Sequence, residues 1–239
     1  MRGHRKGRAW LVTALAVAVA AVLGALVWAG RLSGGDAATA AVLLPSSAPE
    51  VAAARDRLAA LPVVPRPGPA RNYRRVAFGP AWADTDGNGC NQRDDVLLRD
   101  LLPSQPYRLG AQGRCDHDVL AGSWLDPYTG RTISLADAKA QAQEVQVDHI
   151  VALSVAWRYG ADAWSDAKRL AFATDLRELL AVGGDTNDAK GGADASQWRP
   201  APAARCGYAV RYVAVKAAYD LATDATEKRA LAAMLDSCD

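Results

Sequence analysis

A carboxylate and an imidazole stand side by side inside a stretch of the chain that favours a β-strand. Asp148 and His149 follow residues 144–147 and precede the apolar run 150–153, and the whole chain has only 3 histidines. A carboxylate can hold a divalent metal ion, and a neighbouring imidazole can remove a proton from water. The pair suits phosphodiester hydrolysis, although such a pair taken alone is more typical of a strand edge or a turn.

A second set of polar residues follows in the sequence Asn187-x-x-Lys190-Gly191. Asn187 can supply another metal ligand, and Lys190 can supply a cation for a phosphate. The apolar run 176–182 predicts a strand, and a short helix carrying Asn187 and Lys190 is expected after it. A hairpin of the two strands, backed by this helix, can bring Asp148 and Asn187 onto one metal ion.

Residues 1–30 do not suit a globular fold. A basic head is followed by an apolar run over 9–29, and the next charged residue is Arg31. The run predicts either a signal peptide or an N-terminal membrane anchor with its basic end inside. It is long for the first and just long enough for the second. In both cases the rest of the chain is exported, either secreted or held outside the cell membrane, and only this segment contacts the membrane.

Residues 31–71 are rich in Ala, Pro, Gly and Ser, which indicates a linker. One part of this region, residues 49–61, has the spacing of a short amphipathic helix. Several prolines between residues 62 and 69 stiffen the approach to the domain that follows. That domain is predicted over residues 72–239.

The chain has 4 cysteines, and an even number in an exported protein indicates disulfides. Three pairings are compatible with the sequence. Short loops close more easily than long ones, which favours the pairs Cys90–Cys115 and Cys206–Cys238. The spacing Cys-x-x-Cys does not occur, which argues against a zinc knuckle.

The charge of the chain excludes a broadly basic nucleic-acid-binding surface. The net charge is +2, but residues 71–239 contain 20 basic and 23 acidic residues. A folded part of this kind cannot rely on general counterion release. Any action on nucleic acid has to come from a local site and a metal ion.

The remaining pattern predicts a helix-rich α+β domain with a small β-element around the Asp148-His149 pair. Helices are expected over residues 96–102, 135–143, 154–160, 165–174, 208–221 and 226–235. Besides the two strands named above, strands are expected over residues 74–78, 115–124 and 131–133.

Several motifs together resemble one known family. They are the loop Asp84–Cys90, the segment Gly122–Gly130, the strand Val147–Leu153, the Asn187-x-x-Lys190-Gly191 sequence, Trp198, and the closing cysteines Cys206 and Cys238. In this combination the chain resembles exported HNH (His-Asn-His, ββα-metal) endonuclease proteins, which are similar to the C-terminal domain of GmrSD-type restriction endonucleases. The resemblance covers residues 72–239 and implies a helix-rich domain around a small ββα-metal core, stabilised by two disulfides.

The resemblance also implies a role for each site residue. His149 would be the general base that activates water, and Asp148 and Asn187 would bind the metal ion. Lys190 would steady the phosphate or the charge that develops on it. The oxygen-rich ligands favour Mg²⁺, with Mn²⁺ as an alternative. The substrate would be nucleic acid, with DNA favoured over RNA, and no protein partner is indicated.

Two positions depart from the family pattern. Glu178 stands where an asparagine would help to fix the histidine loop, and an ionised carboxylate there can accept a hydrogen bond but cannot donate one. Gly192 stands where an acidic residue is common. Glu178 and the acidic net charge of residues 71–239 keep a second hypothesis open, a catalytically weak or inactive extracellular binding module that is stabilised by calcium on the same scaffold.

One loop nearly matches a calcium-binding loop. Its first, third and fifth positions are Asp84, Asp86 and Asn88, a glycine follows at the sixth, and Asp95 takes the twelfth. The twelfth residue is Asp where the longer Glu is usual, and no helix is predicted before the loop. The alternative is an Asx-rich turn locked by the neighbouring disulfide.

Other residues are candidates for substrate contact, each with a more ordinary alternative. Arg93, Arg108, Arg131 and Arg169 can contact phosphates, but a solvated position or an ion pair is the more common outcome for any one of them. Five aromatic side chains can stack on bases, although core packing is more common for each: Trp124, Tyr128, Trp157, Trp164 and Trp198.

Overall fold

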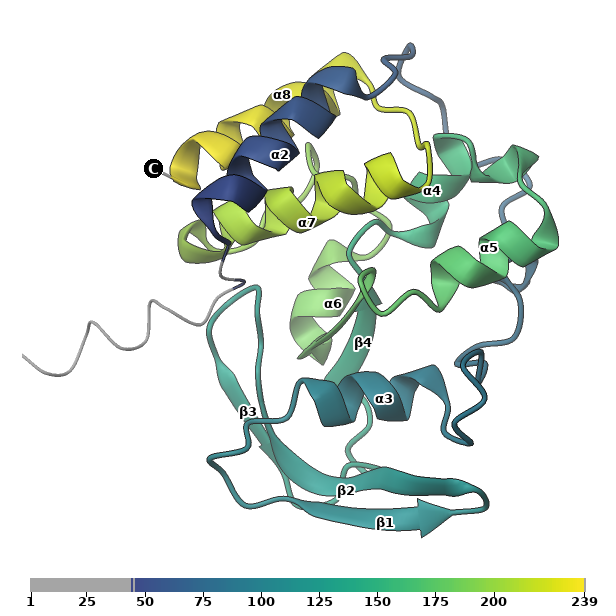
Figure 1. Cartoon of the computed structure of the whole chain (residues 1–239), viewed down its shortest axis with the longest axis vertical. Helices are drawn as coiled ribbons and strands as arrows, with labels where there is room; N and C mark the ends of the chain where they lie inside the picture. Colours follow the sequence, from purple (N-terminus) through teal and green to yellow (C-terminus); the bar gives the residue numbers. More distant parts are fainter. Residues whose placement is uncertain (1–43, 45, 239) are drawn as a thin grey trace, which may run out of the picture. The chain divides into compact units, whose positions relative to one another are not determined.

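A two-stranded antiparallel sheet followed directly by a helix lies in the middle of the described chain (Figure 1). The computed structural model describes residue 44 and residues 46–238. The sheet consists of β4 (Val145–His149) and β5 (Leu179–Gly183), and α6 (Gly184–Lys190) follows β5 without an intervening loop. Helices and two small antiparallel sheets make up the fold, which confirms the α+β prediction.

The pairing register of β4 and β5 determines which side chains lie on each face of the hairpin. In this register His149 pairs with Leu179 and Asp148 pairs with Leu180. Successive side chains of a strand point to opposite faces. Asp148 and Gln146 hydrogen bond to residues of α6, so His149 lies on the face that is turned away from this helix.

The junction between β5 and α6 requires a glycine. A Cβ atom at Gly184 would lie 1.8 Å from the carbonyl oxygen of Gln143, so any side chain would collide with the backbone that leads into β4. This close approach allows the amide of Gly184 to donate to the carbonyl oxygen of Glu144, at 3.0 Å. The start of α6 is therefore held against the start of β4.

Helical turns fill the connection from β4 to β5. They are α4 (Leu153–Arg158), the 3₁₀-helix η2 (Ala161–Ala163) and α5 (Asp166–Ala173). Ser165 caps α5 by accepting a hydrogen bond from the amide of Lys168, which satisfies one of the free donors at a helix start. Phe172 anchors α5 in the core, and this anchor places the carbonyl oxygen of Ala173 near His149.

A three-stranded antiparallel sheet lies on the other side of a short helix. The strands are β1 (Arg108–Gln112), β2 (Cys115–Leu125) and β3 (Thr132–Leu135), with β2 in the middle, and the helix is α3 (Gln92–Arg99). This helix contacts β2, β4 and β5. The buried Trp124 indole donates to the carbonyl oxygen of Leu97, at 2.9 Å, and joins the sheet to the helix.

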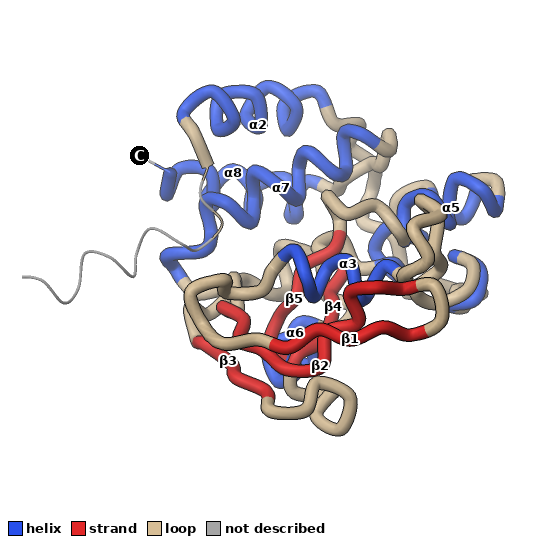
Figure 2. The backbone as a smooth tube through the Cα atoms, turned by 60° about the horizontal axis from the view of Figure 1, so that its bottom comes forward, coloured by secondary structure: helices blue, strands red, loops and turns tan. Residues whose placement is uncertain are grey.

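The third part of the fold is a layer of three helices, seen together in Figures 1 and 2. They are α2 (Ala48–Ala60), α7 (Arg205–Ala218) and α8 (Ala225–Leu235). Val51, Ala54 and Leu58 are buried on one face of α2 and belong to the main core cluster. The linker predicted over residues 31–71 thus contains a core helix, while the domain limits 31–71 and 72–239 stay a prediction.

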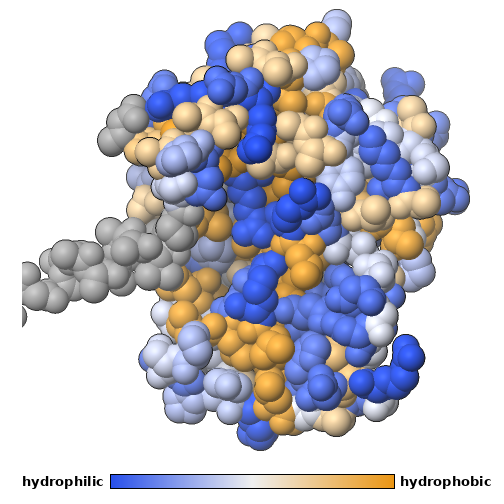
Figure 3. All heavy atoms as spheres, viewed as in Figure 1, coloured by the Kyte–Doolittle hydropathy of each residue, from blue (hydrophilic) through white to orange (hydrophobic). Residues whose placement is uncertain are grey.

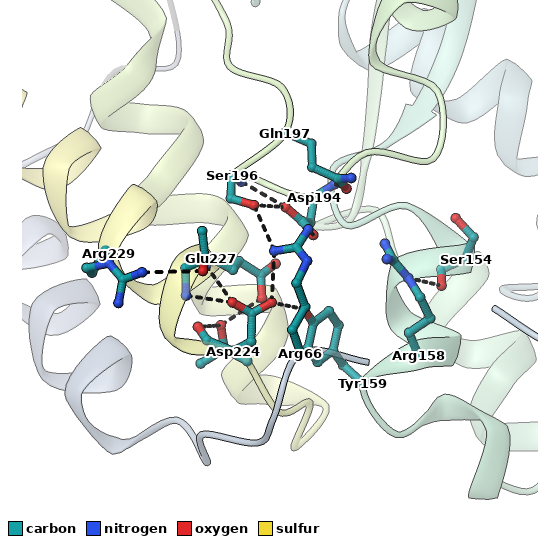
Figure 4. Close-up of polar contacts among 12 residues, drawn as sticks. Arg66, Ser154, Arg158, Tyr159, Asp194, Ser196, Gln197, Asp224, Glu227 and Arg229 are labelled. Carbon is teal, nitrogen blue, oxygen red and sulfur yellow. Dashed lines mark hydrogen bonds and ion pairs between the residues drawn. The ribbon is translucent and has the colours of Figure 1, made fainter. Parts of the chain in front are cut away.

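Arg66 connects the segment after α2 to this layer (Figure 4). Its guanidinium lies 3.0 Å from a carboxylate oxygen of Asp194 and 3.1 Å from one of Asp224. The hydroxyl of Tyr159 donates to the same oxygen of Asp224, and Asp224 caps α8 by accepting from the amides at its start. One arginine thereby joins three segments that are far apart in sequence.

Two disulfides close the fold with the expected pairing. Cys90–Cys115 joins the loop before α3 to the first residue of β2, and Cys206–Cys238 joins the first turn of α7 to the 3₁₀-helix η4 (Asp236–Cys238). The described residues contain no free cysteine. Each bridge therefore ties a chain end or a loop to a regular element.

Two predicted elements are wrong. Residues 75–78 form the 3₁₀-helix η1 (Arg75–Phe78) instead of a strand, because Phe78 is buried and no strand pairs with this segment. Residues 135–143 do not form the predicted helix, because Leu135 ends β3, where it pairs with Gly122, and the residues from 138 to 144 form turns. The carboxylate of Asp137 accepts from the amides of Lys139 and Ala140, which stabilises the turns that follow β3.

The signal peptide or anchor predicted over residues 1–30 lies outside the described residues. Among the residues that the structure describes, no helix has both the length and the apolar character needed to cross a bilayer. The surface view shows hydrophilic and apolar residues interspersed on one face (Figure 3), as is usual for folded domains.

Candidate catalytic cavity

One cavity of about 640 Å³ brings together residues from three separate segments. Asp148 and His149 come from the end of β4, Asn187 comes from α6, and Arg75 and Trp82 come from the segment that begins with η1. The structure therefore places three of the four predicted site residues around one space. The fourth, Lys190, does not line this cavity.

The imidazole of His149 is held in one orientation. Its Nε2 lies 3.0 Å from the carbonyl oxygen of Ala173, and its ring runs nearly parallel to that of Trp82, with 17° between the planes and 6.4 Å between the centroids. A carbonyl oxygen only accepts hydrogen bonds, so Nε2 carries the proton in this arrangement. The lone pair of Nδ1 is then the basic position of the ring.

His149 is uncharged at neutral pH in this environment. Burial, followed by the positive charge of Arg75, lowers the pKa of His149 to about 3, because both effects disfavour the imidazolium form. A neutral imidazole is the form that can accept a proton. The ring is thus in the unprotonated form from which a general base acts, while the same low pKa reduces its basicity.

The carboxylate of Asp148 is bound by two buried partners. The hydroxyl of Tyr128 donates to Oδ2 at 2.7 Å, and Nζ of Lys190 lies 3.0 Å from Oδ1 and 2.9 Å from Oδ2. The ammonium also donates to the carbonyl oxygen of His149, at 2.8 Å. Lys190 is only 2% exposed and acts on Asp148 and the backbone of β4. Its predicted contact with a substrate phosphate stays a prediction.

The oxygen atoms that face the cavity are suitable ligands for a hard divalent cation. Nδ2 of Asn187 donates to Oε1 of Gln146, at 2.8 Å, which leaves the amide oxygen as a ligand atom. A carboxylate has roughly four acceptor positions, and Tyr128 and Lys190 occupy three of them at Asp148. Asp188 adds a second carboxylate to the cavity wall. Carboxylate and amide oxygens are the ligands that Mg²⁺ and Mn²⁺ prefer.

Glu178 supports the turn that follows His149. Both carboxyl oxygens face the amide of Val151, at 3.0 and 3.3 Å, and its backbone carbonyl accepts from the amide of Ile150 at 2.9 Å. Burial raises the pKa of Glu178 well above its usual value, while the charge of Lys190 opposes this effect. The raised pKa favours a neutral carboxylic acid. The contacts fix the backbone after the histidine, and the imidazole itself is held by Ala173.

Comparison with known proteins shows which family the chain belongs to. The family model described as "GmrSD restriction endonucleases, C-terminal domain" matches residues 91–234, which is more than half of the chain. The chain belongs to this family. The match relates it to nucleases and includes the whole of the hairpin and α6.

One relative is similar in sequence over most of this chain. A protein of Arthroderma benhamiae named "Uncharacterized secreted protein" is 37% identical over 205 residues, which span 84% of this chain and 93% of that protein. No solved structure matches the chain. The similarity therefore extends well beyond the site motifs, to most of the sequence.

Three of the four arginines proposed for phosphate contact are engaged elsewhere. Arg93 donates to the carbonyl oxygen of Val145, Arg131 pairs with Asp185, and Arg169 donates to backbone carbonyls such as that of Trp164. Arg108 lies on β1, and none of the four is among the residues that line the cavity. The five predicted aromatic residues are also absent from the lining, although Tyr128 binds Asp148 from below.

Arg75 and Trp82 are cavity residues that sequence reasoning missed. Arg75 fell in a predicted strand, and Trp82 fell between predicted elements. One signal for Trp82 was available, because a tryptophan in a segment with Gly79 and Pro80 has no helix or strand to bury it. No local signal distinguishes Arg75 from its neighbour Arg74.

The loop proposed to bind calcium has internal hydrogen bonds. The Asp84 carboxylate accepts from the amides of Gly87 and Gly89, and Nδ2 of Asn88 donates to Asp86 and Asp95. These contacts describe an Asx-rich turn next to the Cys90 disulfide. A calcium ion at Asp84, Asp86, Asn88 and Asp95 stays a prediction. A nearby cluster of Cys90, Cys115 and His117 is not suited to a metal ion, since its two cysteines are disulfide-bonded.

Proposed function

We propose that this chain is an exported, metal-dependent endonuclease that hydrolyses phosphodiester bonds of nucleic acid through an HNH-type ββα-metal core. The observation that carries the proposal is the shared cavity of Asp148, His149 and Asn187, which come from the first strand and the helix of a strand–strand–helix unit. Membership in a restriction endonuclease domain family supports the reaction class. DNA is the favoured substrate, with RNA as the alternative.

His149 acts as the general base in this proposal. Nδ1 removes a proton from the water that attacks the phosphorus atom, and the carbonyl of Ala173 keeps the ring aligned through Nε2. The lowered pKa of His149 keeps the ring free of a proton before the reaction. Glu178 preserves this geometry by binding the amide of Val151 in the following turn.

Asp148 and Asn187 would hold the divalent ion, with Mg²⁺ favoured and Mn²⁺ as the alternative. Such an ion stabilises the negative charge that develops on the phosphate and its leaving oxygen. Lys190 contributes from beneath the cavity, because its buried ammonium favours the ionised form of Asp148. The lysine is thus a positioning residue for the ligand carboxylate.

Export is supported by three observations. The chain begins with a basic head and an apolar run over residues 9–29. It contains two disulfides, which persist in oxidising compartments. Its relative from Arthroderma benhamiae is named as a secreted protein. A secreted form and a form anchored through residues 1–30 both satisfy these observations.

Replacing His149 by alanine in the full-length protein tests the proposal. Plasmid DNA and RNA are incubated with the protein in Mg²⁺, Mn²⁺, Ca²⁺ or EDTA. We expect metal-dependent cleavage that falls by about 10²–10⁴-fold in His149→Ala, the usual contribution of a general base. His117→Ala, which removes a histidine remote from the cavity, serves as the matched control and keeps its activity.

Two results would contradict the assignment. Cleavage by His149→Ala at close to the original rate would exclude this histidine as the base. A folded protein that cleaves neither substrate with any of the ions would exclude the nuclease and favour the inactive binding module.

A further inference from the structure

Arg75 is the cation at the mouth of the cavity. Among the described residues that line the cavity it is the one lysine or arginine, and two carboxylates, those of Asp148 and Asp188, line the same cavity. Its side chain is exposed, and within residues 46–238 its guanidinium is placed over an aromatic ring instead of in an ion pair. Arg75 is therefore available to an anion.

The surrounding charge makes this position important. Residues 71–239 are net acidic, so a polyanion is not attracted by the domain as a whole. Lys190 is fully buried and bound to Asp148. A phosphate that approaches His149 meets a favourable charge at Arg75, whose field already reaches the imidazole.

Trp82 is held beside the cavity by an unusual backbone. Its φ is 56°, in the left-handed region that bulky residues rarely adopt. Such conformations cluster at functional sites, where the surrounding structure maintains them. The indole is half-buried, and Arg75 lies over it with 5.8 Å between the guanidinium carbon and the ring centroid. The two side chains form one unit.

A second hollow adjoins the main cavity at the same pair. It has a volume of about 140 Å³, and Arg75, Trp82 and Leu153 line both this hollow and the main cavity. Val76 also lines it and is 74% exposed. The hollow is mainly apolar in its lining, and an aromatic ring forms one wall.

We propose that Arg75 and Trp82 form the substrate-binding edge of the cavity and select a nucleic-acid strand with unpaired bases. Arg75 binds a backbone phosphate beside the scissile one, and Trp82 stacks on the base next to it in the apolar hollow. Stacking requires a free base face, which single strands and locally unpaired segments offer and duplexes do not. This inference rests on the proposed nuclease function and adds the class of substrate to it.

Binding measured without cleavage separates the two proposals. The probes are a short fluorescein-labelled single-stranded DNA, its RNA counterpart and the DNA as a duplex, and the protein is the full-length His149→Ala variant. Fluorescence anisotropy is followed over a series of salt concentrations. Because binding is measured directly, the measurement is valid even if no form of the protein cleaves nucleic acid.

We expect the single strands to bind more tightly than the duplex. Arg75→Ala should weaken binding and reduce the slope of log K against log salt by about 0.7, the value for one phosphate contact on a single strand. Arg74→Ala removes the same charge from the neighbouring exposed residue and should leave both quantities unchanged. Trp82→Ala should weaken single-strand binding by about 5–150-fold, the range measured for loss of one stacked base, and Trp82→Phe should retain most of the affinity.

A second measurement does not depend on the Trp82→Ala variant. Addition of the single strand should quench tryptophan emission, and the quenching should diminish in Trp82→Phe, which keeps an aromatic ring. Equal effects of Arg75→Ala and Arg74→Ala would overturn the phosphate contact. Equal binding of duplex and single strand, with no change in quenching in Trp82→Phe, would overturn the stacking role and the preference for unpaired bases.

Discussion

Two buried lysine–carboxylate pairs lie in different parts of the molecule and have nearly the same chemistry. Lys190 binds Asp148 below the catalytic cavity, and Lys216 binds Glu227 between α7 and α8. Both lysine side chains are 0% exposed. In each pair a tyrosine hydroxyl donates to the same carboxylate, Tyr128 to Asp148 and Tyr212 to Glu227.

The surroundings of the two pairs differ. Asp148 borders a cavity that also contains His149 and Asn187. Glu227 accepts a further hydrogen bond from Thr223 and lies near the Arg66 network of Figure 4, within the packed helical layer. A buried ion pair therefore does not by itself indicate a functional site. Access of substrate to the carboxylate makes the difference.

Loss of either lysine should have the largest effect. Lys216→Met and Lys190→Met each leave a buried carboxylate without its cation, and removal of one partner of a buried pair costs about 3–5 kcal/mol. We expect both variants to lose stability in chemical denaturation at neutral pH. Cleavage per folded molecule should fall in Lys190→Met and stay unchanged in Lys216→Met. Equal activity of the two variants would show that Lys190 does not support the site.

Loss of the tyrosine hydroxyls should have an intermediate effect. Tyr128→Phe and Tyr212→Phe each remove one hydrogen bond to a charged group, which is worth about 1.5–3 kcal/mol. Thermal unfolding should detect a similar loss in both. Cleavage should weaken in Tyr128→Phe, because the ligand carboxylate loses a contact that orients it. A drop of the same size in Tyr212→Phe would remove the distinction drawn between the two pairs.

Replacement of both charged partners should have the smallest net effect on stability. A buried pair exchanged for apolar residues of similar volume is often neutral or stabilising. Lys216→Met with Glu227→Leu should therefore be more stable than Lys216→Met alone and keep its activity. Lys190→Met with Asp148→Leu should also recover stability, yet remain inactive because the metal ligand is lost. A double variant less stable than its single parent would argue that the remaining hydrogen bonds of the carboxylate dominate.

The sequence predicted the hairpin and the meeting of Asp148, His149 and Asn187 well. Strand-like runs with a helix directly after the second one leave few ways to arrange these residues. The predicted disulfide pairing was also confirmed. It could be predicted because both loops are short. Local patterns carry this information, and they suffice when the partners belong to one supersecondary unit.

Other features depend on contacts that no local pattern encodes. The ammonium of Lys190 turns toward Asp148 because of the face that β4 presents to α6. Arg75 and Trp82 reach the cavity from a segment far upstream of His149. The helix predicted over residues 135–143 fails because its first residue, Leu135, belongs to β3, where it pairs with Gly122. Each of these contacts could be predicted only if the distant or competing group that the residue meets were already known.

The position of α2 in the helical layer has a consequence for how the molecule is made. Synthesis proceeds from the N-terminus, so this helix emerges long before α7 and α8, against which its apolar face packs. Cys238, which completes the second disulfide, follows Cys206 by 32 residues. The hairpin with the catalytic candidates can therefore form before the helical layer, which needs both α7 and α8. Synthesis interrupted within α8 would leave the hairpin attached to an incomplete helical layer with an exposed apolar face.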